Sequence, residues 1–138
     1  MSAVAHAVFN RVRVIWLDVA LAAIAALAYV LIGLRVLAVG DLATAEAPAA
    51  ITYVAAGGYL LGGTLILARR RWLWIVGAVI NALVILFFAM AYQDRPAVMF
   101  SPGGLATKAA QLLLEVGLIS LIVADWRNAR RQRATDGR

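Results

Sequence analysis

The sequence predicts an all-α integral membrane protein, a bundle of four transmembrane helices joined by short loops, with both termini at the cytoplasmic face. Of the 138 residues, 64% are hydrophobic and 14% are charged, and the mean hydropathy is +0.89. A soluble domain is about 45–50% apolar and about 25% charged. The apolar residues form four continuous runs, and most arginines lie outside them, before, between or after the runs. This length allows one domain, so residues 1–138 are expected to form a single membrane domain.

Each apolar run is long enough to cross a bilayer as a helix, because a hydrocarbon core about 30 Å thick requires roughly 20 residues. Only helices and closed barrels satisfy the backbone in lipid, and the runs lack the alternation of barrel strands. We therefore predict helices over about residues 14–36, 50–68, 72–92 and 105–125, followed by a basic cytoplasmic tail at 126–138.

An alternative for the first run is a cleaved signal peptide, since the small residues Ala43 and Ala45 resemble a cleavage site. The apolar stretch is longer than the roughly 7–15 residues of a signal peptide, so we expect a retained span. Between the third and fourth helices, residues 93–104 carry turn signals at both ends. The apolar residues 97–100 between these signals are expected to pack in the membrane interface, and the alternative is that they cover the mouth of the bundle.

The basic residues are distributed unequally between the two sides of the predicted bundle. Ten of the 13 Lys and Arg residues lie on one side, namely Arg11, Arg13, Arg69, Arg70, Arg71, Arg127, Arg130, Arg131, Arg133 and Arg138. The other side holds Arg35, Arg95 and Lys108. Cytoplasmic loops carry the excess of basic residues, so both termini and the turn at 69–71 are expected in the cytoplasm.

Aromatic residues and overall composition agree with this orientation. The four tryptophans, Trp16, Trp72, Trp74 and Trp126, all fall at the predicted cytoplasmic boundary, as in an interfacial aromatic belt. The abundance of alanine and arginine favours a bacterial inner membrane.

Several classes of chemistry are excluded by the residue types present. The chain has no cysteine, which removes disulfides, thiolate metal sites and iron–sulfur clusters. Its one histidine, His6, precedes the first helix, so a haem held by two histidines is excluded as well. The motifs of zinc proteases, serine hydrolases and P-loop enzymes are missing. We expect no catalytic residue, metal or cofactor, and we attribute the net charge of +6 to membrane topology rather than to nucleic-acid binding.

Polar residues form a stripe on the fourth predicted helix. Thr107, Lys108, Gln111 and Glu115 are spaced three, four and seven residues apart, so they share one face. Glu115 lies near the bilayer centre, where an acid requires a protein or water partner. Asn81 lies at a similar depth in the third helix, so we expect a hydrogen bond between the two. Two interpretations stay open, an outward-facing polar pocket with Glu115 as its base, or a structural clamp between helices.

Small residues in the second predicted helix indicate a close helix contact. Gly58 and Gly62 lie four residues apart on one face, and the first helix offers Ala22 and Ala26 as a matching surface. Small residues at this spacing let two helix backbones approach closely. We favour packing within the subunit, with homodimerisation as the alternative.

Charged residues lie near both ends of the first predicted helix. Asp18, one turn inside the cytoplasmic edge, is expected to form a local ion pair with Arg13 or with the arginines at 69–71. Arg35, near the outer end, can reach the surface and pair with Asp41 or Glu46. Binding of an anionic headgroup is the alternative for Arg35.

By elimination, the sequence favours an accessory or interaction subunit of a membrane assembly. The chain has almost no soluble part, helix faces rich in small residues, and a basic tail that attracts anionic lipid. The expected partners are the bilayer, anionic headgroups at the cytoplasmic face, and a membrane protein or a second copy, with no nucleic acid. The alternative is a small proton-linked transporter or ligand-binding membrane protein with an outward-facing pocket around Glu115.

Overall fold

The computed structural model describes residues 3–42 and 49–136, and within these residues it is all-helical, with no strand. Its elements are α1 (Ala3–Gly33), α2 (Ala49–Leu67), α3 (Arg71–Tyr92), the short α4 (Pro96–Met99) and α5 (Pro102–Asp136). α1, α2, α3 and α5 are each long and apolar enough to cross a membrane. This result confirms the prediction of four apolar helices.

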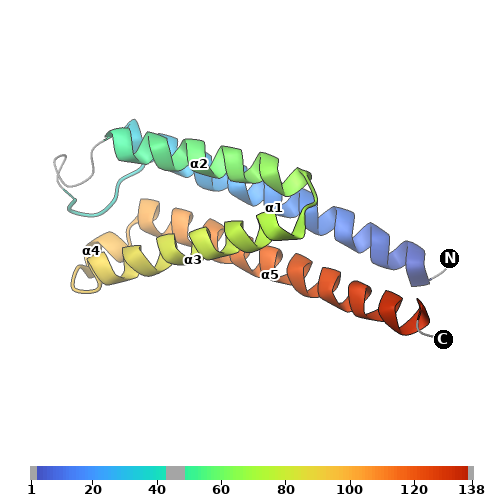
Figure 1. Ribbon diagram of the computed structural model, residues 1–138. Coiled ribbons are helices and arrows are strands. Elements are labelled where there is room, and N and C mark those ends of the chain that lie inside the picture. Colours follow the sequence, from blue (N-terminus) through green and yellow to red (C-terminus); the bar gives the residue numbers. More distant parts are fainter. Residues whose placement is uncertain (1–2, 43–48, 137–138) are drawn as a thin grey trace.

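The four long helices pack as a bundle in which α1 and α5 occupy the centre (Figure 1). α1 packs extensively against α2 and against α5, and α3 packs against α5. α2 and α3 share a tight turn but make few direct contacts, and they diverge with distance from that turn (Figure 1). The core of the bundle is formed by side chains of all four helices, including Ile15, Ile66, Trp74, Leu118 and Leu121.

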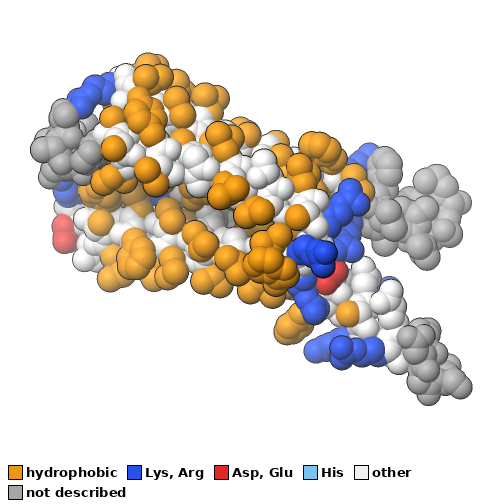
Figure 2. All heavy atoms as spheres, turned by 45° about the horizontal axis from the view of Figure 1, so that its top comes forward, with side chains coloured by type: hydrophobic (Ala, Val, Ile, Leu, Met, Phe, Trp, Pro, Cys, Tyr) orange, Lys and Arg blue, Asp and Glu red, His pale blue; other side chains and the backbone are white. Residues whose placement is uncertain are grey.

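Most large hydrophobic side chains face outward instead of into this core. Leu17, Ile24, Phe87 and Val116, for example, are all more than half exposed. Figure 2 shows hydrophobic side chains along the length of the bundle, with charged side chains gathered toward its two ends. A helix that is apolar on all sides is typical of a membrane span.

The first and last helices are longer than predicted and extend past α2 and α3 at the end where both termini lie (Figure 1). At about 1.5 Å per residue, the 19 residues of α2 and 22 of α3 span about 28 and 33 Å, close to the thickness of a bilayer core. The 31 residues of α1 and 35 of α5 span about 46 and 52 Å. The predicted tail is therefore helical up to Asp136, because no Gly or Pro interrupts α5 after Gly117.

The opposite end is closed by α4 and the start of α5. Val98 is fully buried, whereas Phe100 is 70% exposed, so the apolar stretch at 97–100 packs partly over the bundle instead of lying wholly in the interface. The Ser101 hydroxyl accepts a hydrogen bond from the Gly104 backbone N–H at 3.0 Å and caps α5. The backbone N–H of Gly103 donates to the Ala38 carbonyl at 2.9 Å, which ties α5 to the chain after α1.

The four tryptophans expected in an interfacial belt differ in their exposure. Trp16, Trp72 and Trp126 are more than half exposed, but Trp74 is fully buried. Its indole N–H donates to the Ile66 carbonyl at 3.2 Å, and the Arg11 guanidinium lies 5.2 Å from its ring centroid. Trp74 thus belongs to the core, because α3 turns this face toward α1 and α5.

Candidate functional site

A hydrogen-bonded cluster connects all four long helices in the middle of the bundle. We call it the mid-bundle cluster, and its members are Tyr29 on α1, Tyr59 on α2, Asn81 on α3, and Lys108, Gln111 and Glu115 on α5. Gln111 is fully buried and Asn81 is 4% exposed. The cluster therefore lies where water is scarce, and its polar groups depend on one another for hydrogen bonds.

The hydrogen bonds of this cluster run in one direction, from a cation to an acid. Lys108 Nζ donates to Gln111 Oε1, and Gln111 Nε2 donates to the Tyr59 hydroxyl at 2.6 Å. The Tyr59 hydroxyl donates to Asn81 Oδ1 at 2.9 Å, and Asn81 Nδ2 donates to Glu115 Oε2 at 2.9 Å. The last of these is the hydrogen bond expected between Asn81 and Glu115. Bonds in such a chain polarise one another, so the arrangement stabilises both ends.

In the middle of this series of hydrogen bonds, both side-chain N–H protons of Gln111 and both of Asn81 are donated. The second Nδ2 proton of Asn81 goes to the Gln111 backbone carbonyl at 2.9 Å, and the second Nε2 proton of Gln111 goes to the Tyr29 hydroxyl at 2.9 Å. The amine of Lys108 also lies 4.1 Å from the centroid of the Phe88 ring, a cation–π contact. The geometry thus supports the clamp, since Lys108 and Glu115 compensate each other through three uncharged side chains.

Two members of the cluster were missed from the sequence. Tyr29 and Tyr59 stack with ring centroids 5.7 Å apart and an interplanar angle of 14°, and both hydroxyls accept from Gln111. The signal was available, because a tyrosine in the middle of an apolar helix needs a partner for its hydroxyl. Thr107, conversely, was assigned to the pocket, but its buried hydroxyl bonds to the Gly103 and Gly104 carbonyls of its own helix.

At the end that holds both termini, the ion pairs differ from those predicted. Arg11 and Arg71 both pair with Asp125, with N–O distances of 3.0 and 3.7 Å, so one acid links α1, α3 and α5. Asp18 is fully buried, and neither of its oxygens has a hydrogen-bond partner among the described residues. No hydrogen bond to Asp18 therefore supports the local ion pair expected for it. Its carboxylate lies against Gly117 on α5, where a Cβ would overlap it.

Another ion pair lies at the opposite end of the bundle. Asp41, one of the two acids expected near Arg35, pairs with Arg95 at 3.2 Å. The other acid, Glu46, lies outside the described residues. Arg35 itself is exposed and follows the end of α1 with a φ of 60°.

The expected packing of Gly58 and Gly62 against the first helix is corrected by the structure. A Cβ at either glycine would meet nothing within 4 Å. The close approach is made by Gly63, where a Cβ would lie 3.2 Å from the Cβ of Ala22. The predicted alanine surface is present, since Ala22 and Ala26 are 1% and 2% exposed. The face of α2 that meets α1 was assigned one position away, because four glycines within seven residues offer several equivalent spacings.

Gly58 and Gly62 instead line a cavity between the diverging helices α2 and α3, which we call the α2–α3 groove. The groove has a volume of about 360 Å³, and Ala22 of α1 and Leu118 of α5 contribute to its lining. All other side chains that line it are apolar or glycine, apart from Tyr59 and Asn81. The groove thus reaches the mid-bundle cluster from the side of the bundle, between two helices that would face lipid.

No group of three His, Asp or Glu side chains that could hold a metal ion occurs among the described residues. Comparisons with protein-family models, with curated protein sequences and with solved structures return no match for this chain.

Proposed function

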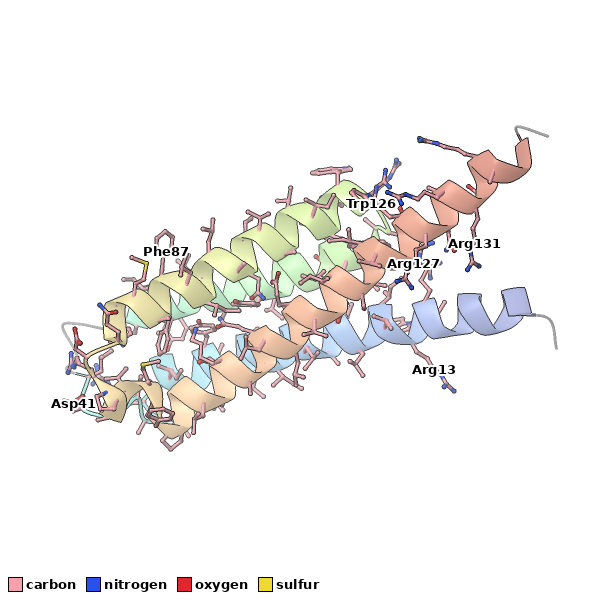
Figure 3. The ribbon with its side chains drawn as sticks, turned by 90° about the horizontal axis from the view of Figure 1, so that it is seen from below. Arg13, Asp41, Phe87, Trp126, Arg127 and Arg131 are labelled. Carbon is pink, nitrogen blue, oxygen red and sulfur yellow. The ribbon has the colours of Figure 1, made fainter. Side chains whose placement is uncertain are left out.

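We propose that this chain is a multi-pass protein of a bacterial inner membrane that acts as an accessory or interaction subunit of a membrane assembly, with both termini in the cytoplasm. The observation that carries the proposal is the helical extension of α5 beyond the bundle. The extension, from Trp126 to Asp136, presents exposed arginines on a continuous helix. Figure 3 shows Arg127 and Arg131 on it, with Arg13 of α1 at the same end and Asp41 at the other.

The length of this extension separates lipid contacts from protein contacts. The headgroup layer on one side of a bilayer is about 5–7 Å thick. Arg127 follows Trp126 directly and lies at headgroup level, where it attracts anionic lipid. Arg133 is seven residues beyond Trp126, a rise of about 10 Å along the helix axis. The outer arginines thus stand above the headgroups, where they are available to an acidic surface of a partner protein.

The test is charge reversal on the exposed face of the extension. We expect the triple change Arg127→Glu, Arg130→Glu and Arg133→Glu to release a stoichiometric partner that the wild type retains during purification from native membranes in mild detergent. The matched control replaces the same three arginines with lysine and keeps the partner, because electrostatic attraction needs the charge alone. Native mass spectrometry gives the stoichiometry. The proposal is wrong if wild type and both variants purify as the same homo-oligomer.

A second candidate, the small proton-linked transporter, is favoured by one observation, the presence of Lys108 and Glu115 in a single buried network. The Glu115→Gln variant, purified in the same way and assayed for proton flux, discriminates between the two functions. Glutamine keeps an oxygen that accepts from Asn81, so we expect the assembly to survive and proton flux in liposomes to equal that of the wild type. Loss of a pH-dependent flux in this variant, with the assembly intact, would instead establish the transporter.

A further inference from the structure

Asp18 on α1 is a buried acid that belongs neither to the mid-bundle cluster nor to the ion pairs at the end with both termini. It lies on the face of α1 that enters the hydrophobic core, one turn after Ile15 and one turn before Ala22. Asp18 is 0% exposed, and neither carboxyl oxygen has a hydrogen-bond partner among the described residues. Both oxygens are therefore removed from water, and no described group donates to them in return.

Gly117 allows α5 to lie directly against this carboxyl. A Cβ on Gly117 would overlap Asp18 Oδ1 and would lie 2.8 Å from Oδ2. The missing side chain thus lets the two helices close over both oxygens, which solvent does not reach.

The contact between Asp18 and Gly117 lies just inside the point where α1 and α5 leave the bundle. Seven residues before Asp18, Arg11 pairs with Asp125, which lies eight residues after Gly117. These separations correspond to about 10 and 12 Å along the two helix axes. The contact and the ion pair are therefore successive steps of one antiparallel seam, which we call the α1–α5 seam. Both helices continue beyond it toward the termini (Figure 1).

The charged groups at the end with both termini are not hydrogen-bonded to Asp18. α2 contains no Lys, Arg, Asp or Glu. Arg71 at the start of α3 and Arg11 on α1 both pair with Asp125. Arg13, five residues before Asp18, makes no hydrogen bond to its carboxyl.

The charged groups of α5 inside the bundle belong to the mid-bundle cluster. Glu115 is two residues from Gly117 but about 200° around the helix, where it accepts from Asn81 on α3. Lys108 lies about two and a half turns from Gly117, toward the opposite end of the bundle. A negative charge on Asp18 would therefore have no compensating cation in contact with it among the described residues.

We propose that Asp18 is a proton-binding site whose proton keeps the α1–α5 seam closed. A buried carboxylate without partners costs far more free energy than the neutral acid, so the closed seam holds the protonated form. When the proton passes to water, the charge that remains requires solvation, and α1 and α5 have to separate at Gly117 to admit it.

The closed seam therefore holds one proton more than the open seam, and a rise in pH favours the open seam. One proton changes the ratio of closed to open molecules by at most about tenfold per pH unit. This inference needs no partner protein, so its outcome is separate from that of the proposed function. Where the extension of α5 holds a partner, the same movement makes that contact dependent on pH.

The test measures the distance between α1 and α5 where they leave the bundle. Arg13→Cys on α1 and Asn128→Cys on α5 each receive a spin label, and the chain has no native cysteine to compete. The label separation is measured in nanodiscs by pulsed electron paramagnetic resonance from about pH 5 to about pH 9. We expect a short-distance population at low pH to give way to a longer one, by up to about tenfold per pH unit. One distance at every pH overturns the proposal.

Variants then assign the response to Asp18. Asp18→Asn keeps the size of the side chain and cannot ionise, so we expect the short distance at every pH. Asp18→Ala gives the same expectation without a polar group, which keeps the test valid if the amide impairs folding. The matched control is Glu115→Gln, which removes the acid of the mid-bundle cluster and is expected to keep the wild-type response. A pH response that persists in either Asp18 variant, or that disappears in the control, overturns the proposal.

Discussion

At the residue scale, Asp18 and Gly117 show how a single missing side chain makes room for an acid. Asp18 is fully buried on α1 with no hydrogen-bond partner among the described residues, and Gly117 of α5 faces it. A buried acid without partners is costly in the apolar part of a bundle. The glycine prevents a further cost, since even a methyl group on Gly117 would collide with the carboxylate.

This pair predicts a coupling that a double-mutant cycle measures. We expect Gly117→Ala to lower the free energy of unfolding by about 1–3 kcal/mol, because an added methyl group in a packed contact forces the helices apart. In an Asp18→Ala background the same change is expected to cost less than about 0.5 kcal/mol, since the atoms it meets are gone. Equilibrium unfolding in mixed micelles gives both values, and an equal cost in the two backgrounds contradicts the contact.

At the element scale, the α1–α2 contact depends on Gly63, whereas neighbouring glycines of α2 leave it unaffected. Gly63 is buried against Ala22, while Gly57 faces open space. We expect Gly63→Leu to reduce the free energy of unfolding by about 1–3 kcal/mol through overpacking. The matched change Gly57→Leu is expected to stay within about 0.5 kcal/mol of the wild type. The same micellar unfolding checks this, and a reversed order of the two variants would show that α1 packs on another face of α2.

At the scale of the whole molecule, the proposed orientation predicts which residues a reagent reaches from each side of the membrane. The chain has no cysteine, so a single introduced cysteine gives the only labelling signal. We expect Arg133→Cys to react with a membrane-impermeant maleimide only after the cells are opened, and Asp94→Cys to react in intact cells. Labelling of both in intact cells, or the reverse pattern, would refute the orientation with both termini in the cytoplasm.

The sequence alone determined the number and type of the long helices and the approximate limits of α2 and α3, because hydropathy and length decide whether a helix matches a bilayer. It also placed Asn81 beside Glu115 and gave Gln111 a polar role, since helical periodicity and depth are local properties. Tertiary structure decided which faces meet. The distances between side chains on different helices depend on the rotation of each helix about its axis, which an apolar sequence leaves nearly undetermined. That rotation brings Tyr29 and Tyr59 into the mid-bundle cluster, selects Gly63 over Gly58 and Gly62 for the contact with α1, and opens the α2–α3 groove.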